Sequence, residues 1–282
     1  MSLTIRSNQS AMFATHNLSK TQSNLTSSLE KISSGLRINR AADDAAGLGV
    51  VVRMENTNTS LQQAMRNTND GISFVQTAEG SIEQLSNILI RFRELSVQAA
   101  NETYTTTDRT MIQTEMAQLK NEYNRITSTA NFNEQDLLEA TIALSIQVGI
   151  DGATSNRISF TLSNFATTAG AIGGGLSVVF GQIANAANVT VAQANLARLD
   201  SAVNALSTRR AKLGAIQNRF ENALAEASTY SQNLSAAQSQ ILDVDYATES
   251  ANMTRFQIQQ QAGVAALAQA KAIPQSVISL LS

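Results

Sequence analysis

Apolar residues recur at steps of three and four over two stretches that are much longer than an ordinary helix. The first stretch, residues 56–100, carries Leu61, Met65, Ile72, Val75, Ile82 and Leu89. The second, residues 189–242, carries Leu199, Val203, Leu206, Leu213, Phe220, Leu224, Ala227, Leu234 and Ile241. This spacing puts one apolar stripe along one side of a helix, and the chain's single proline, Pro274, interrupts neither stretch. Each stripe has to be covered, so we predict a mainly α protein built on a long-helix antiparallel bundle or coiled coil.

Polar residues break the second stripe at four positions. These are Arg210, Gln217, Ser231 and Gln238. Polar residues in such a seam cost stability but can specify register and partner number. For Arg210 a second interpretation stays open, in which the side chain faces solvent at the edge of a bundle.

Both ends of the chain also carry amphipathic helical patterns. A helix is predicted over residues 10–36, and another within residues 243–282. Short helices are marginal alone in water, and chain ends fray unless they are held. If the long helices run out and return, the terminal helices emerge side by side and pair. We expect them to form one polymerisation interface, through Leu25, Leu29, Ile32, Leu36, Met253, Phe256, Val264, Leu267, Ile278 and Leu281.

The middle of the chain changes its period. A polar segment, residues 101–108, precedes a third predicted helix, and from Ile142 the apolar residues alternate with smaller or polar ones. That alternation predicts a small central β-hairpin within residues 140–165. The glycine-rich residues 170–175 predict a surface loop. The expected organisation is therefore a terminal helix (residues 1–42), an outer helical region with the hairpin (43–188), a long returning helix (189–242) and a second terminal helix (243–282).

Charge and composition exclude several classes of function. The net charge of -2 offers no basic stripe for a nucleic acid, although residues 1–42 carry five basic residues against one acidic residue. There is no cysteine, and the single histidine, His16, cannot form a metal or catalytic site alone. The adjacent acids Asp43 and Asp44 diverge on a helix and suit a capping or linker role. We therefore expect no enzyme activity, no cofactor and no metal.

No segment of the sequence predicts membrane insertion or a cleaved secretory signal. The N-terminal residues lack the charged start and apolar run of such a signal, and no apolar run reaches membrane-spanning length. If the protein leaves the cell, we expect a route that does not cleave a conventional signal.

Four segments carry a family resemblance. Residues 33–50, SSGLRINRAADDAAGLGV, and residues 243–282, DVDYATESANMTRFQIQQQAGVAALAQAKAIPQSVISLLS, resemble the linker and C-terminal blocks of bacterial flagellins. Residues 90–101, IRFRELSVQAAN, and residues 146–152, IQVGIDG, are similar to two further blocks. The resemblance implies a homopolymeric filament subunit that is exported unfolded and assembles outside the cell, beside cap and hook-junction proteins. Its terminal helices are expected to line an inner tube and its bundle an outer tube. A hook-filament junction protein and a secreted helical effector are the alternatives.

The resemblance also implies two binding sites. Arg91 and Leu95 in RFREL, with Glu115 in IQTE, match the residues through which many flagellins contact Toll-like receptor 5, although Phe92 stands where a smaller aliphatic residue is common. The tail resembles the segment held by an export chaperone, with Leu267, Val277, Leu280 and Leu281 as candidate anchors. Pro274 is expected to bend this tail helix or to end its regular part.

Overall fold

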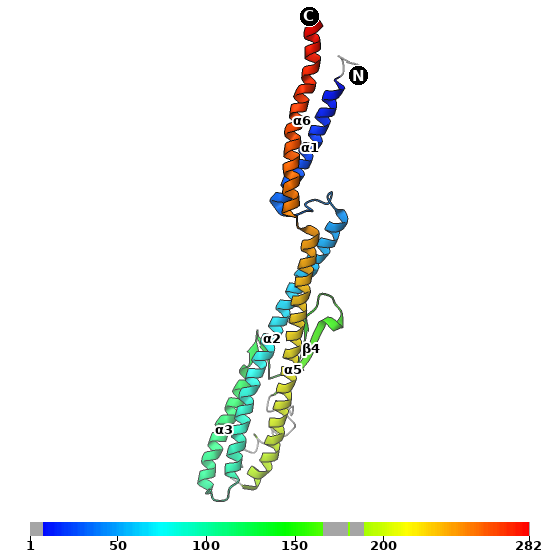
Figure 1. Cartoon of the computed structure of the whole chain (residues 1–282). Helices are drawn as coiled ribbons and strands as arrows, with labels where there is room; N and C mark the ends of the chain where they lie inside the picture. The colour runs from blue at the N-terminus through cyan, green and yellow to red at the C-terminus, as the bar shows by residue number, and fades with distance from the viewer. Residues whose placement is uncertain (1–7, 166–179, 181–188, 282) are drawn as a thin grey trace. The chain divides into compact units, whose positions relative to one another are not determined.

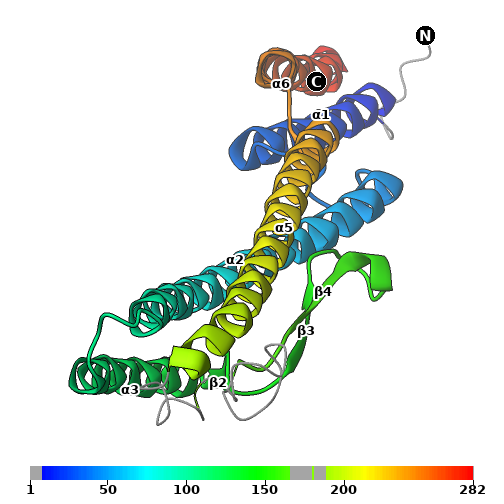
Figure 2. The same ribbon diagram turned by 90° about the horizontal axis from the view of Figure 1, so that it is seen from below.

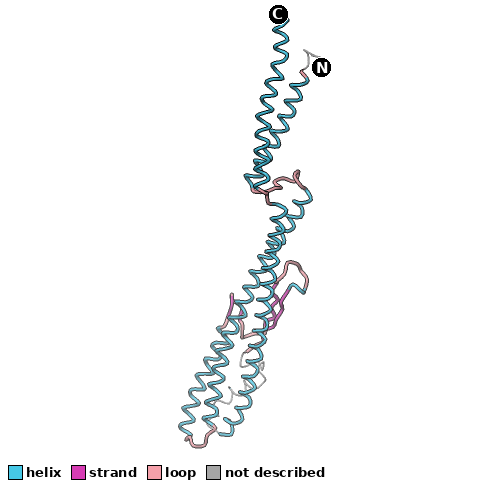
Figure 3. Tube along the Cα trace, in the orientation of Figure 1, coloured by secondary structure: helices cyan, strands magenta, loops and turns pink. Residues whose placement is uncertain are grey.

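The computed structural model describes residues 8–165, 180 and 189–281, with side chains described as far as Ala272. Most of this chain is helical, as the tube in Figure 3 shows. The helices are α1 (Gln9–Ser34), α2 (Ala45–Ala99), α3 (Thr106–Thr129), α5 (Val189–Leu242) and α6 (Tyr246–Leu281). The chain divides into two compact units. We call Met1–Asn58 with Gln232–Ser282 the terminal unit, and Thr59–Ser231 the central unit.

The central unit is a bundle in which α3 and α5 run opposite to α2 (Figure 1). On α5 the buried residues follow a seven-residue repeat, at Leu199, Leu206, Leu213, Phe220 and Ala227. The first four of them pack in one core with α2 residues that include Val75, Ile82, Leu85, Leu89 and Phe92. Because the two long stripes cover each other, the predicted mainly α bundle is confirmed.

Aromatic rings join the helices to the strands in this core. Phe74 on α2 lies edge-on to Phe132 and Phe160, with ring centroids 5.5 Å and 6.0 Å away. The centroid of the Phe160 ring in turn lies 6.2 Å from that of Phe220 on α5. The hydroxyl of Tyr123 on α3 is buried and donates to the carbonyl of Phe165 at 3.1 Å. Edge-on rings add to the stability that their buried area gives, so these contacts hold the strands against the bundle.

The predicted hairpin is formed by β3 (Ile142–Gln147) and β4 (Arg157–Leu162), which pair antiparallel from Ile142 with Leu162 to Gln147 with Arg157. Figure 2 shows the pair beside α2 and α5. Residues of β4 alternate between exposed and buried, with Ile158, Phe160 and Leu162 turned into the core. The first strand ends at Gln147 rather than continuing to Ile150, and a short 3-10 helix, Thr154–Asn156, lies in the connection.

A second, smaller hairpin was not predicted from the sequence. Its strands are β1 (Asn131–Phe132) and β2 (Gln135–Asp136), joined by Asn133 and Glu134. Both turn residues have positive φ, 49° and 65°, as a two-residue hairpin turn of this hand requires. The side chains of Leu137 and Leu138, which follow directly, are fully buried and fasten the hairpin to the core.

Three local expectations need correction or completion. Helix α2 begins at Ala45, earlier than the predicted residue 56, because the Asp44 carboxylate accepts the Gly47 N–H at 2.8 Å and caps the helix. Helix α6 continues past Pro274 to Leu281, so the proline does not end it. Arg210 lies at the bundle edge, 3.5 Å from Glu79 and 3.8 Å from Glu83 on α2. The glycine-rich residues 170–175 lie outside the described residues.

Candidate assembly interface

In the terminal unit, α1 and α6 lie side by side and run in opposite directions (Figure 1). The Asn8 amide donates to the carbonyl of Ala270 at 2.8 Å, and near the middle the Gln260 amide donates to Gln22. A Cβ on Gly263 would lie 3.3 Å from Leu18 Cδ1, so the missing side chain allows close approach there. These contacts define one antiparallel register over most of both helices.

The covered positions of both helices recur at steps of three and four. We call them the seam: Ala11, Ala14, Leu18, Thr21, Leu25, Ser28 and Ile32 on α1, with Met253, Phe256, Gln260, Gly263, Leu267 and Ala270 on α6. The seam is only partly apolar, and only Leu25 and Ser28 on α1 are fully buried. The paired helices therefore cover one side of each other and leave the remaining sides open to solvent.

Large apolar side chains remain on those open sides. We call them the exposed apolar set: Met12, Phe13, Leu29, Ile258 and Val264, whose exposed fractions lie between 46% and 69%. The residues predicted for polymerisation therefore fall into two groups. Leu25, Ile32, Met253, Phe256 and Leu267 are used within the chain, whereas Leu29 and Val264 are exposed. Leu36 is half-buried just after the end of α1, and the side chains of Ile278 and Leu281 lie outside the described residues.

Backbone contacts join the C-terminal end of α1 to the N-terminal end of α6, and we call them the junction. Leu36 forms an antiparallel bridge with Asp243, the Arg37 N–H donates to the Leu242 carbonyl at 2.6 Å, and the Val244 N–H donates to the Gly35 carbonyl at 3.0 Å. Gly35 has φ 74°, and a Cβ there would lie 3.0 Å from the hydroxyl oxygen of Tyr246. Only glycine fits this position without strain.

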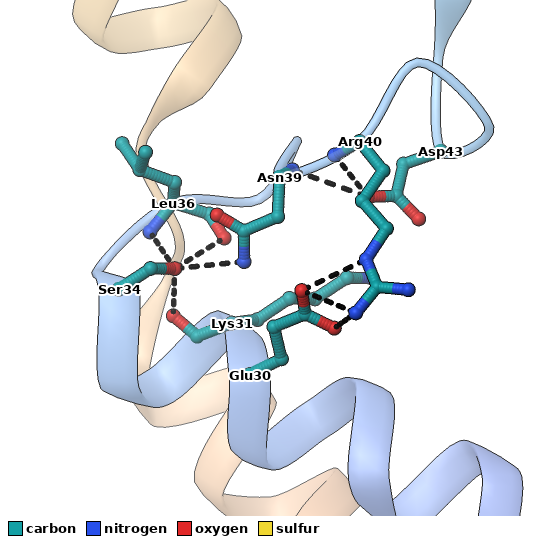
Figure 4. A network of polar contacts seen from close by, with 7 residues as sticks. All are labelled: Glu30, Lys31, Ser34, Leu36, Asn39, Arg40 and Asp43. Atoms are coloured by element: carbon teal, nitrogen blue, oxygen red, sulfur yellow. Dashed lines mark hydrogen bonds and ion pairs between the residues drawn. The ribbon is translucent and has the colours of Figure 1, made fainter.

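Side chains of the linker after α1 form a polar network (Figure 4). The Arg40 guanidinium donates to both carboxylate oxygens of Glu30 at 3.0 Å, and the Asn39 amide donates to Ser34 Oγ at 2.8 Å. The Asp43 carboxylate accepts the backbone N–H groups of Asn39 at 3.1 Å and Arg40 at 3.0 Å. Since these partners all lie within the linker and the end of α1, the linker has a defined conformation.

We expect this network to loosen in acid. The backbone N–H groups of Arg40 and Asn39 lower the pKa of Asp43 below its ordinary value of 3.8. A lowered pKa means that the stabilisation is fully present above pH 3.8 and is lost as the pH falls through the folded-state pKa. In an NMR titration, the Asn39 and Arg40 amide resonances should therefore move with a midpoint below pH 3.8. Asp43→Asn, the control, should remove that transition, and an unchanged transition in this variant would contradict the assignment.

The predicted receptor residues lie in the central unit, and two of the three reach the surface. The Arg91 guanidinium bridges Glu115 on α3, at 2.8 Å, and Glu94 on its own helix, at 2.9 Å. The hydrogen bond to Glu115 and then that to Glu94 raise the pKa of Arg91. Leu95 is 1% exposed and packs in the core, so it can only support the surface above it.

Residues 8–165, 180 and 189–281 contain no group of three His, Asp or Glu side chains that could hold a metal ion. In the same part of the chain, none of the helices is both long and apolar enough to span a membrane. His16 is exposed on α1.

Known proteins resemble this chain over nearly its whole length. The family model of the bacterial flagellin N-terminal helical region matches residues 5–143, and that of the C-terminal helical region matches residues 196–281. The flagellar filament 33 kDa core protein of Treponema phagedenis is 40% identical over 98% of this chain and 99% of its own length. A flagellin of Halalkalibacterium halodurans is also 40% identical, with the same shares covered.

A solved structure gives a more distant likeness. It comes from Vibrio parahaemolyticus, is provisionally named as a flagellar hook-associated protein, and is 15% identical with a TM-score of 0.61. The match covers 71% of this chain and 100% of the solved chain. At this identity it shows a shared fold alone. The two family models and the relatives that match over almost their whole length are decisive: this chain belongs to the bacterial flagellin family.

Proposed function

We propose that this protein is the structural subunit of a bacterial flagellar filament, and that it polymerises through the terminal unit. The observation that carries the proposal is the exposed apolar set on a pair of helices that are already held in register by the seam and the junction. Exposed apolar patches on soluble proteins often mark surfaces that contact another protein. In a polymer, neighbouring copies would cover Met12, Phe13, Leu29, Ile258 and Val264.

The comparisons support the same function. One relative is named as a filament core protein, and its 40% identity extends over nearly the full length of both chains. The hook-associated neighbour shares the fold at 15% identity, so a role at the hook junction has the weaker support. A filament subunit acts outside the cell, and we propose export in an unfolded state followed by assembly beneath a cap.

Substitution of Phe13 tests the interface. Phe13 is 64% exposed on α1, so Phe13→Ala should leave the monomer's stability nearly unchanged. If a neighbouring copy buries the ring, the critical concentration for filament formation should rise about tenfold, which corresponds to about 1.4 kcal/mol. Sedimentation and electron microscopy measure the change.

Asn17→Ala, at an exposed polar position of the same helix, is the matched control and should assemble like the wild type. If Phe13→Ala also assembles at wild-type concentrations, the ring does not lie in a contact between subunits. If the wild-type chain forms no filaments, the proposed function fails.

The tail is also proposed to bind the export chaperone before assembly. Leu267 is half-covered by α1 in the folded chain, so the chaperone would bind before α1 and α6 pair. An amphipathic helix without its partner is suited to an apolar groove on another protein. Val277, Leu280 and Leu281, whose side chains lie outside the described residues, complete the proposed contact.

The proposed contact with Toll-like receptor 5 rests on Arg91 and Glu115, which form an exposed ion pair between α2 and α3. Arg91→Ala should lower receptor activation by the monomer in a reporter-cell assay. Arg93→Ala is the control, because Arg93 lies on the same helix α2 as Arg91 and forms a comparable exposed ion pair with Asp200 on α5. Equal losses in both variants would point to a general effect on the bundle.

A further inference from the structure

The central unit has a groove of about 650 Å³ between β4 and α5. Ser159 and Thr161 of β4, and Ser163 directly after it, line its strand side. Its helix side presents Arg209, Lys212 and Arg219, at spacings of three and seven residues that place them along one side of α5. No carboxylate lines the groove.

The cations of this groove are not paired with carboxylates in its lining. The acidic residues closest to the groove residues in sequence are Asp200, which pairs with Arg93 at 2.5 Å, and Glu221, which accepts a hydrogen bond from the Gln217 amide at 3.0 Å, and neither lines the groove. In the described part of the chain, neither Lys212 nor Arg219 forms an ion pair. Residues 166–188 carry no charged residue in the sequence and could supply no counter-charge. The cations of the groove therefore have no carboxylate partner among the residues that line it.

The guanidinium of Arg209 lies against an aromatic ring and a carbonyl oxygen of the groove. Its guanidinium lies 4.7 Å above the ring of Phe165, and its Nη1 is 3.4 Å from the Asn164 carbonyl oxygen. Burial lowers the pKa of Arg209 below its ordinary value, since the charged form has lost part of its hydration. An incoming carboxylate would restore a favourable charge environment there.

The matching negative charge lies on the small hairpin β1–β2 and the residues directly after it. Glu134, Asp136 and Glu139 are exposed, and residues 126–156 contain no lysine or arginine. None of the three carboxylates forms an ion pair among the described residues. Leu137 and Leu138 are fully buried, and Phe132 packs against Phe74, so the hairpin is held rigidly and presents its acids without further ordering.

We infer that the acidic β1–β2 hairpin of one copy docks into the basic groove between β4 and α5 of a second copy. The inference rests on the proposed polymer and adds a second contact, between central units, to the contact made by the terminal helices. Complementary charges of this kind steer association and specify register, and they weaken as salt is added.

Chemical cross-linking tests the contact in the natural filament. A carbodiimide joins the amine of Lys212 to a carboxylate that it already touches, without a spacer. Filaments grown from a mixture of 15N-labelled and unlabelled chains should yield a mixed-label peptide that joins Lys212 to Glu134, Asp136 or Glu139. Monomers treated in the same way should not. If wild-type filaments yield only same-label links, or none at these positions, the inference is overturned.

Charge reversal provides the second test. Lys212→Glu with Arg219→Glu should raise the critical concentration about tenfold at low salt, and Glu134→Lys with Asp136→Lys should do the same. The chain that carries all four substitutions should recover to within about threefold of the wild type, because the charges again match. Arg66→Glu, at an exposed position outside the groove, is the control for charge reversal and should assemble normally.

The possible outcomes separate the inference from the proposed function. Recovery of filament assembly in the chain with all four substitutions supports the docking. It also shows that the groove substitutions and the hairpin substitutions do not unfold the chain. If the groove variant fails while the hairpin variant assembles normally, the groove binds something other than this hairpin and the inference is wrong. If the wild-type chain does not polymerise at all, the proposed function itself fails.

Discussion

A chain that lacks residues 252–282 is expected to remain monomeric at concentrations where the full chain sediments as filaments. The deletion removes the α6 half of the seam, including Met253, Phe256 and Leu267. It also uncovers Leu25, and an isolated α1 of 26 residues with a partly polar seam is marginal in water. The deletion therefore removes the preformed pair of helices and also the exposed apolar residues of α6. We therefore expect at least a hundredfold loss in assembly, on the order of 2.7 kcal/mol or more.

The central unit should survive the same truncation. Its core, from Phe74 to Phe220, lies within Thr59–Ser231 and uses no residue of the deleted segment. Circular dichroism should then show a cooperative thermal transition like that of the full chain, with a loss of helical signal that matches the missing residues. If the truncated and full chains sediment alike, the terminal helices do not form the interface. If the cooperative transition disappears, loss of assembly reflects unfolding of the central unit.

Phe220→Ala is expected to lower the free energy of unfolding of the central unit by about 3–5 kcal/mol. Phe220 is 0% exposed and its ring touches Phe160. A Cβ on Gly71 of α2 would lie 3.0 Å from its Cζ. Its removal leaves a cavity where α2, α5 and β4 meet, and neighbours this tightly packed can collapse only partly. Urea unfolding followed by circular dichroism measures the loss.

Phe13→Ala is the matched control for this measurement. The same side chain is removed, but from a position that is 64% exposed, so the unfolding midpoint should hardly change. The two variants should therefore behave in opposite ways: Phe220→Ala weakens the fold, whereas Phe13→Ala weakens assembly. Equal destabilisation by both would mean that the exposed apolar set is part of the folded core.

Secondary structure was largely predictable because its signals are local. The seven-residue repeat of α5 and the alternation in β4 can be read from the sequence. The apolar face of each of these two elements is buried, as predicted. The start of α2 was placed too late because Gly47 and Gly49 suggested a break, whereas the Asp44 cap and tertiary contacts around the buried Ile38 hold the helix there. The β1–β2 turn lacks the usual Asn-Gly signal. Its Asn133-Glu134 turn is held by neighbouring contacts such as Phe132 against Phe74.

The candidate interface shows the limit of sequence reasoning most clearly. Leu25 and Leu29 are one helical turn apart, and periodicity assigns both to one apolar stripe. Only the position of α6 decides that Leu25 is 6% exposed while Leu29 is 46% exposed, since a single partner helix covers a narrower strip than the stripe itself. The sequence alone thus determined the family, the helices and the need for a partner at both ends. The tertiary structure decided which apolar residues the chain covers for itself and which it leaves exposed, because that division depends on the packing of two helices that are far apart in sequence.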